Sequence, residues 1–244
     1  MRVFAGVPFF EANLDEAAKL VVEHAVNSRT STFHLVNAYS IAAASENPEY
    51  KKVLTDSRTN FADGFPISLL TKFSARPLSQ VRGPDLFREV IRRSESAQVK
   101  HFFLGSSNEV LDRIVERLQL DYPLAQVAGT YSPPFRELDA NERDDQAKKI
   151  IDSGANLVWV ALGTPKQDIE ANRLASETGK TVAAVGAAFD FFAGTTREAP
   201  PWLSSVGLEW AFRLITEPRR LWKRYLIGNL KFLGVVAKYQ VSSK

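Results

Sequence analysis

Short apolar runs alternate with stretches whose apolar residues recur at helical spacing along most of the chain. Leu111, Ile114 and Leu118, for example, fall on one face of a helix. The apolar runs predict buried strands at residues 32–36, 99–104, 124–128, 156–162 and 181–185. This alternation predicts an α/β fold with an open, mostly parallel sheet flanked by helices. Ligands of such a sheet gather beyond the carboxyl ends of its strands.

The pattern changes at about residue 200, beyond which no strand pattern remains. We therefore predict an α/β core over residues 1–195 and a basic, aromatic-rich helical appendage over residues 196–244. The appendage holds nine Lys and Arg against three Glu, a net charge of +6. Since the whole chain carries +3, the core carries −3. This asymmetry indicates a polyanionic partner, which could be nucleic acid, anionic lipid or a phosphorylated substrate.

The 244 residues suffice for one large domain with an appendage. The chain has no cysteine, which excludes disulfides and thiolate metal sites and fits a reducing cytosol. The first residues do not form a secretory signal, because Pro8 and Glu11 interrupt their apolar stretch. No run approaches the roughly 18 apolar residues that a spanning helix needs. We therefore expect a cytoplasmic protein without a membrane-spanning helix.

Two turns follow predicted strands and resemble helix starts that bind anions. At Gly163-Thr164-Pro165-Lys166-Gln167, Thr164 is expected to cap a helix that begins at Pro165, with Gln167 completing a capping box. Free backbone N–H groups at Gly163 would suit a phosphate. The alternative is that Gln167 merely caps its own helix and the turn binds no ligand. At Gly105-Ser106, Ser106 is the expected cap, and a plain helix start is favoured there.

Asp63 is the candidate general base. It precedes Gly64 and lies between Phe61 and Phe65, so partial desolvation would raise its pKa toward a useful range. We expect it to lie between two helical stretches, and the alternative is an Asx-turn residue.

Two further polar residues could reach the same cleft. Asn37 ends the first predicted strand, where its amide could point into the cleft or cap the next helix. Arg82 precedes the helix start at Gly83-Pro84-Asp85, where it could reach an anion or lie in solvent.

The appendage combines basic groups with amphipathic aromatics. Arg213, Arg220 and Arg224 would share a face of one continuous helix, although Pro218 predicts a new helix start between them. Trp222, Tyr225, Leu226 and Phe232 accompany these basic groups and Lys223. The composition suits an interfacial helix on anionic lipid, a nucleic-acid contact or a solvated helix face, and the aliphatics favour the membrane slightly.

Metal-ligating patterns are missing from the sequence. No Asp-x-Asp pair suggests a metal–diphosphate site, and His24, His34 and His101 lack metal-ligand spacing and are interpreted as structural. We expect neither a metal nor a cofactor.

Together these segments resemble the WecG/TagA/CpsF family of bacterial glycosyltransferases, glycosyltransferase family 26, over almost the whole chain. Its pattern appears in order as Asn37, Asp63-Gly64, Gly83-x-Asp85, Gly163-x-Pro165-Lys166-Gln167, Phe189-Asp190, Ala199-Pro200-x-Trp202, Gly207-Leu208-Glu209-Trp210 and Glu217-Pro218-x-Arg220.

The resemblance implies an inverting, metal-independent enzyme that moves a sugar such as N-acetylmannosamine from a UDP-sugar to a polyprenyl-diphosphate-linked acceptor. Such enzymes make teichoic acid linkers and other surface polysaccharides, as peripheral proteins on the inner face of the cell membrane. Asp63 corresponds to the family's general base. Arg213 and Arg220, with Lys223 or Arg224, are expected to contact phosphates. Nucleic acid is then not an expected partner, and homo-oligomerisation stays open.

Three residues depart from the family pattern. Leu35 replaces a usual threonine, Gln80 replaces a usual arginine for which Arg82 could substitute, and Asp168 replaces a glutamate. The alternative function is therefore a catalytically weakened binding protein for nucleotide-sugars or lipid diphosphates.

Overall fold

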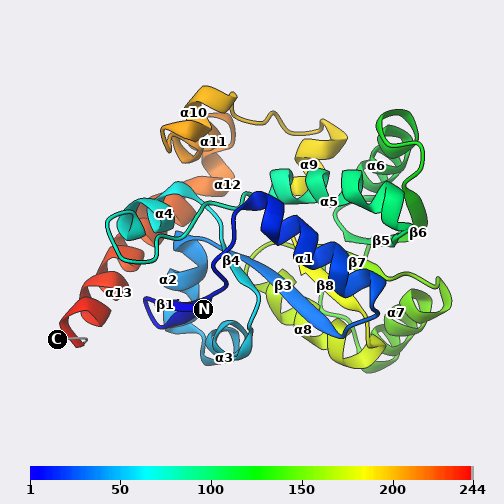
Figure 1. Ribbon diagram of the computed structural model, residues 1–244, viewed down its shortest axis with the longest axis horizontal. Helices are drawn as coiled ribbons and strands as arrows, with labels where there is room; N and C mark the ends of the chain where they lie inside the picture. The colour runs from blue at the N-terminus through cyan, green and yellow to red at the C-terminus, as the bar shows by residue number, and fades with distance from the viewer. Residues whose placement is uncertain (243–244) are drawn as a thin grey trace. The chain divides into compact units, whose positions relative to one another are not determined.

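The computed structural model describes residues 1–242, and for residues 201, 205 and 240–242 it describes only the backbone. Lys244, which belongs to the predicted basic appendage, lies outside the described residues. The chain forms two compact units (Figure 1). The first unit contains residues 1–13, 35–82 and 197–244, and the second contains residues 14–34 and 83–196. Segments from the two ends of the chain therefore fold into one unit.

The second unit is built around parallel strands. Its elements are α1 (Leu14–Val26), β3 (Ser31–Val36, continuing into the first unit), α5 (Gly83–Ala97), β5 (Lys100–Gly105), α6 (Asn108–Asp121), β6 (Gln126–Tyr131), α7 (Ala140–Asp152), β7 (Leu157–Ala161), α8 (Lys166–Thr178), β8 (Thr181–Ala184) and α9 (Ala188–Ala193). With β4 (Asn60–Ala62) of the first unit, the strand order is β4-β3-β8-β7-β5-β6, and the pairs from β3 to β6 are parallel. The predicted α/β class is confirmed.

The sheet buries both faces, because neighbouring residues of its strands point to opposite sides. On one side, Val158 and Val160 of β7 pack with Leu174 of α8 and Ile150 of α7. On the other side, Trp159 packs against the ring of Phe87 from α5, at 4.9 Å between ring centroids. Figure 1 shows α1 and α5 on one side of these strands and α7 and α8 on the other. Continuous apolar runs such as residues 156–162 are typical of strands buried on both faces.

The first unit consists mainly of helices. Its elements are β1 (Arg2–Phe4), β2 (Val7–Phe9), α2 (Ala38–Glu46), α3 (Pro48–Asp56), β4 (Asn60–Ala62), α4 (Phe65–Thr71), α10 (Pro201–Ser205), α11 (Glu209–Thr216), α12 (Pro218–Trp222), a π-helical segment η1 (Lys223–Ile227) and α13 (Gly228–Ser242). β1 and β2 form an antiparallel hairpin. The C-terminal segment is helical, as predicted, and Pro218 begins a new helix there.

The C-terminal segment is part of the packing of the first unit. α13 contacts α2, and Leu221, Phe232 and Val236 are buried. The ring of Phe4 lies 6.4 Å from that of Phe232. Within residues 1–242, no helix is both long and apolar enough to cross a bilayer.

Most predicted strands lie within two residues of their expected positions. The exception is the strand predicted at residues 124–128, which runs from Gln126 to Tyr131 and so ends three residues later than expected. It starts only after the turn that the Ala125 N–H closes on the carbonyl of Tyr122, the residue that ends α6. Three short strands, β1, β2 and β4, have no counterpart in the prediction, since three residues are too few to establish a periodicity.

Candidate active site

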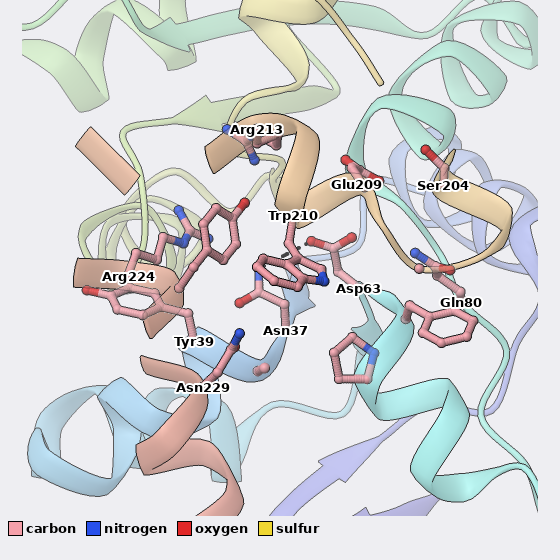
Figure 2. A pocket seen from close by; sticks show the side chains of 16 residues that line it. Asn37, Tyr39, Asp63, Gln80, Ser204, Glu209, Trp210, Arg213, Arg224 and Asn229 are labelled. Carbon is pink, nitrogen blue, oxygen red and sulfur yellow. Dashed lines mark hydrogen bonds between the residues drawn. The ribbon is translucent and has the colours of Figure 1, made fainter. Parts of the chain in front are cut away.

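A pocket in the first unit brings together residues from three separate stretches of the chain (Figure 2). Its lining includes the predicted Asn37, Asp63, Arg213 and Arg224, together with Tyr39, Phe65, Pro66, Gln80, Ser204, Glu209, Trp210, Tyr225 and Asn229. Four of the predicted site residues therefore meet at one pocket.

Asp63 is held at the pocket by its backbone. It directly follows β4, and its N–H donates to the carbonyl of Val36 at 2.8 Å. Asp63 was expected between two helical stretches. A helix does follow it, but the expectation was wrong for the preceding residues, because residues 60–62 form a strand. Gly64 follows with φ of 94°, a conformation that favours glycine, and α4 begins at Phe65.

Asn37 performs both of the roles that were considered for it. Its Oδ1 accepts the N–H of Ser40 at 3.1 Å, which caps α2. Its Nδ2 donates to Oδ2 of Asp63 at 3.4 Å, the dashed line in Figure 2. The cap fixes the amide in position, so the same residue orients the carboxylate.

Burial raises the pKa of Asp63 from its ordinary value to about 6. The negative charge of Glu209 raises it further, while the Asn37 hydrogen bond and the positive charges of Arg82 and Arg224 oppose the shift. Asp63 retains some exposed surface, but protein surrounds most of it. A carboxylate with this pKa is largely ionised at pH 7 and is a stronger base than an exposed aspartate.

Arg82 is bound between two glutamates. Its Nε donates to Glu209 and its terminal nitrogen to Glu198, each at 2.9 Å. Arg82 therefore does not lie in solvent, and its contact with a substrate anion stays a prediction. The salt bridge fixes Glu209 at the pocket. Gln80, which stands where the family usually has arginine, lines the pocket itself.

Arg224 is a partly buried arginine of the pocket. It lies on η1, and its guanidinium stacks on the ring of Tyr39 at 4.8 Å. Burial lowers the pKa of Arg224 and raises that of Tyr225. The π-helical turn widens the spacing of the backbone, and such turns are frequent at functional sites. Arg213 comes from α11 and lies 3.9 Å from Glu217.

Arg220 and Lys223 do not line the pocket. Arg220 is exposed and pairs with Glu217 at 2.8 Å, and Lys223 lies 5.5 Å from the centre of the Trp222 ring. The shared face expected for Arg213, Arg220 and Arg224 is not formed, because α11 ends at Thr216 and α12 starts at Pro218.

Gly163 and Gln167 belong to the second unit, at the carboxyl end of β7. The expected cap was wrong: the helix begins at Lys166, Pro165 occupies the cap position and makes no side-chain hydrogen bond, and the Thr164–Pro165 peptide is cis. Gln167 instead accepts the Gly163 N–H at 3.1 Å with its side-chain oxygen. The buried Gln167 also lies beside Gly186, at the end of β8. The Gly163 N–H is therefore already bonded.

The second expected helix start was displaced by one residue. Ser107, not Ser106, caps α6 by accepting the N–H of Val110, while Ser106 adopts a positive φ of 60°. Glu109 pairs with Arg113 on the helix surface. The turn is followed by a helix start, as expected, with the cap at Ser107.

The histidines have protein partners in the second unit. His34 lies 3.0 Å from Asp168, His24 lies 2.9 Å from Ser31, and His101 accepts the indole N–H of Trp159 at 3.1 Å. Burial lowers the pKa of His101 to about 3. Throughout residues 1–242, no three His, Asp or Glu side chains are grouped as metal ligands.

Sequence reasoning gave no site role to several polar or aromatic residues of the pocket, among them Tyr39, Ser204, Glu209, Trp210, Tyr225 and Asn229. Glu209 and Trp210 belong to the Gly207-Leu208-Glu209-Trp210 block, so a role could have been assigned to them there. Tyr39 follows Asn37 in the first turn of α2, which was a weaker signal. No sequence signal identified Asn229.

Comparison with known proteins identifies the family of this chain. The family model described as "Glycosyl transferase WecG/TagA/CpsF family" matches residues 1–244. An N-acetylglucosaminyldiphosphoundecaprenol N-acetyl-beta-D-mannosaminyltransferase of Bacillus spizizenii (strain ATCC 23059 / NRRL B-14472 / W23) is 31% identical over 202 residues, which cover 82% of this chain and 76% of the relative. A protein of the same name from Bacillus subtilis (strain 168) is 28% identical over 241 residues, which cover 98% of this chain and 91% of the relative. The resemblance in the sequence is thus confirmed, and this chain belongs to the WecG/TagA/CpsF family of glycosyltransferases.

Proposed function

We propose that this glycosyltransferase moves an N-acetylmannosamine-type sugar from a UDP-sugar to an N-acetylglucosamine joined through diphosphate to a polyprenol, with inversion at the anomeric carbon. The acceptor and the transferred sugar are those that the two Bacillus relatives are named for. The observation that carries the proposal is the Asp63 carboxylate, whose pKa is raised to about 6 in a pocket that also contains two arginines.

Asp63 acts as the general base. It accepts the proton of the acceptor hydroxyl as the hydroxyl oxygen attacks the anomeric carbon of the donor. The bond from that carbon to the phosphate oxygen breaks, and its electron pair leaves with UDP. Asn37 holds the carboxylate in position through the 3.4 Å hydrogen bond. With a pKa near 6, the carboxylate is ionised in roughly nine molecules of ten at pH 7.

Arg213 and Arg224 bind the diphosphate charge in this proposal. Guanidinium groups suit phosphate oxygens because their N–H donors match the oxygens in pairs. The stacking of Arg224 on Tyr39 holds it in place before the substrate arrives, so little reorganisation is needed. We assign charge stabilisation to these arginines and not to a metal. Gly163 and Gln167 of the second unit, and the exposed Arg220 and Lys223, remain predicted substrate contacts.

The C-terminal segment is proposed to hold the enzyme on the inner face of the membrane. Trp222, Leu226, Leu230 and Leu233 are exposed on it, while Arg219 and Lys223 supply positive charge nearby in the sequence. Such a surface binds anionic bilayers through both apolar insertion and charge. A peripheral enzyme of this kind would meet an acceptor whose polyprenyl chain stays in the bilayer.

The departures from the family pattern concern the donor. Leu35 is buried at the end of β3 and has no hydroxyl to offer, and Gln80 presents a neutral amide to the pocket. These residues favour a second candidate, a protein that binds the substrates but turns them over weakly. A panel of UDP-sugars, assayed with a lipid-diphosphate-N-acetylglucosamine acceptor, separates the two. Rapid transfer from one donor supports the enzyme, whereas binding without transfer from any donor would contradict it.

A further inference from the structure

We propose that α4 and the loop after it form a second membrane-contacting surface, outside the C-terminal segment, which inserts into the interfacial layer of an anionic bilayer. We call Leu69, Leu70, Lys72 and Phe73 the α4 surface. The inference rests on the proposed lipid-linked acceptor, because it states how the catalytic pocket would meet that lipid.

The α4 surface exposes large apolar side chains beside a cation. Phe73 is 93% exposed, and nearly half the surface of Leu69 and Leu70 is open to solvent. The Nζ of Lys72 lies 5.9 Å from the centre of the Phe73 ring. Apolar side chains grouped this way in a soluble protein mark an interaction surface, whereas single exposed ones are common.

The backbone beneath Phe73 is fixed, so its exposure is not that of an unstructured tip. The Ser74 N–H donates to the Thr71 carbonyl at 3.1 Å, and the Leu78 N–H donates to the Thr71 hydroxyl at 3.1 Å. The Arg2 side chain donates to the hydroxyl of Ser74 and to the carbonyl of Arg76. This network presents Phe73 outward and returns the chain to the buried Leu78.

The α4 surface begins about one helical turn after the residues of α4 that line the proposed catalytic pocket. α4 starts at Phe65, two residues after Asp63, and both Phe65 and Pro66 line the pocket. Phe65 packs so closely on Gly207 that a Cβ there would lie 2.2 Å from its ring. Trp202 and Val206, just before Gly207, are also exposed. A polyprenyl chain leaving the pocket along α4 would meet apolar side chains.

Charge favours an anionic bilayer over a second copy of this chain. The stretch from Gly64 to Val81 contains no Asp or Glu. Its cations are Lys72 and Arg76, both exposed, and Arg76 also lies 3.5 Å from Glu11. Two copies joined through this stretch would bring like charges together, whereas anionic headgroups would attract both Lys72 and the basic C-terminal segment. Phe73 beside Lys72 is the pairing expected at a headgroup boundary.

The absence of cysteine allows one fluorophore to be placed at a single site. Phe73→Cys and Phe135→Cys would each be labelled with a polarity-sensitive dye in the full-length chain. Phe135 is 96% exposed in the second unit, so it is a matched control. With vesicles containing about one-third phosphatidylglycerol, we expect the dye at 73, and not at 135, to shift to the blue and brighten. No shift at 73, or equal shifts at both positions, would overturn the inference.

Binding supplies an independent readout. Phe73→Ser should lower the affinity for these vesicles, measured by sedimentation, at least about fivefold. The reason is that transfer of a phenylalanine side chain from water into the bilayer changes the binding constant by more than that factor. Phe135→Ser should have no effect, and equal melting temperatures would show that both variants fold. If Phe73→Ser instead dissociates a dimer in sedimentation velocity and leaves vesicle binding unchanged, the surface joins two copies and the inference is wrong.

The test is separable from the proposed function. If no sugar is transferred by any protein in the series, the proposed function fails, but the dye and vesicle experiments still decide the membrane contact. If transfer occurs, Phe73→Ser should lower it on vesicle-borne acceptor and leave it unchanged on a short-chain, water-soluble acceptor. An equal loss on both acceptors would contradict a membrane role for Phe73.

Discussion

The side-chain amide of Asn37 joins the cap of α2 to the carboxylate of Asp63, to which it donates at 3.4 Å. The two residues lie 26 positions apart in sequence but side by side in the fold, because the Asp63 N–H bonds to the last residue of β3, Val36. The bond to Val36 fixes the backbone of Asp63 and the Asn37 amide fixes its carboxylate, which therefore has little freedom to turn away from a substrate hydroxyl. The proposed base is therefore positioned before the substrate binds.

Replacing Asp63 tests its role as the base. Asp63→Asn keeps the size of the side chain and removes its basicity, so kcat should fall at least about a hundredfold, the lower range for a positioned general base. Donor affinity, measured by calorimetry, should change little. Turnover at the wild-type rate would remove Asp63 from the mechanism.

Glu209 should set the pH at which the enzyme becomes active. Asp63 must be ionised to accept a proton, so kcat should fall as the pH drops below about 6. The charge of Glu209 raises the pKa of Asp63, and Glu209→Gln should therefore move the acidic limb of the profile to lower pH. The control is Glu198→Gln, which removes the other partner of Arg82 but leaves Glu209 in place. An unmoved limb in Glu209→Gln, or equal shifts in both variants, would contradict this coupling.

The sequence predicted the parallel sheet because its strands are buried on both faces, and buried strands leave long apolar runs such as residues 156–162. β4 was missed because its three residues carry no periodicity, although this short strand places Asp63. Asn37 was recognised at the end of a predicted strand, and Asp63 was recognised by the glycine after it and the phenylalanines on either side. Their contact was not predictable from the residues alone, since it depends on how β4 and the end of β3 pair.

The sequence was still less able to predict which basic residues of the C-terminal segment line the pocket. Arg220, Lys223 and Arg224 are close in sequence, and helical spacing alone cannot say which of them faces a pocket across a proline break. The π-helical turn at Lys223–Ile227 alters that spacing and places Arg224 and Tyr225 at the pocket. Glu209 was overlooked as a charged group because its place at the pocket depends on the salt bridge to Arg82, which lies 127 positions away.

Arg224 and Arg219 offer a test of the leaving-group assignment. Arg224→Gln should lower kcat by about a hundredfold to a thousandfold, the range for loss of one donor to a developing negative charge. Arg219→Gln removes an exposed positive charge from the same segment, outside the pocket, and should change kcat less than about threefold at saturating acceptor. Steady-state kinetics on the two variants gives the comparison. Equal losses would indicate a general effect of charge and would argue against a specific contact by Arg224.

Metal dependence can be measured directly. The sequence has no Asp-x-Asp pair, and the proposal assigns the diphosphate charge to Arg213 and Arg224, so transfer should continue in excess EDTA. The rate before and after dialysis against EDTA is the measurement. Loss of transfer that magnesium or manganese restores would contradict the assignment.

The last prediction concerns the C-terminal segment, where removing the whole segment would be uninformative. Leu221, Phe232 and Val236 are buried against the rest of the first unit, so truncation near residue 200 would expose its core. Substitution of exposed residues avoids this problem. Leu230 is 72% exposed on α13, and Leu120 is 80% exposed on α6 of the second unit, which makes a matched pair. Leu230→Ser should weaken binding to anionic vesicles several-fold, whereas Leu120→Ser should not.

Salt separates the two contributions to this binding. Attraction between the basic groups of the segment and anionic lipid should fade as salt is raised, because counterions screen exposed charges beyond about one Debye length. The apolar contribution of Leu230 should persist, so the ratio of wild-type to Leu230→Ser binding should be the same at low and high salt. Sedimentation with the same vesicles at two salt concentrations measures both effects. If Leu230→Ser and Leu120→Ser bind equally well, the exposed face of α13 is an ordinary solvated surface, and the membrane contact lies elsewhere on the chain.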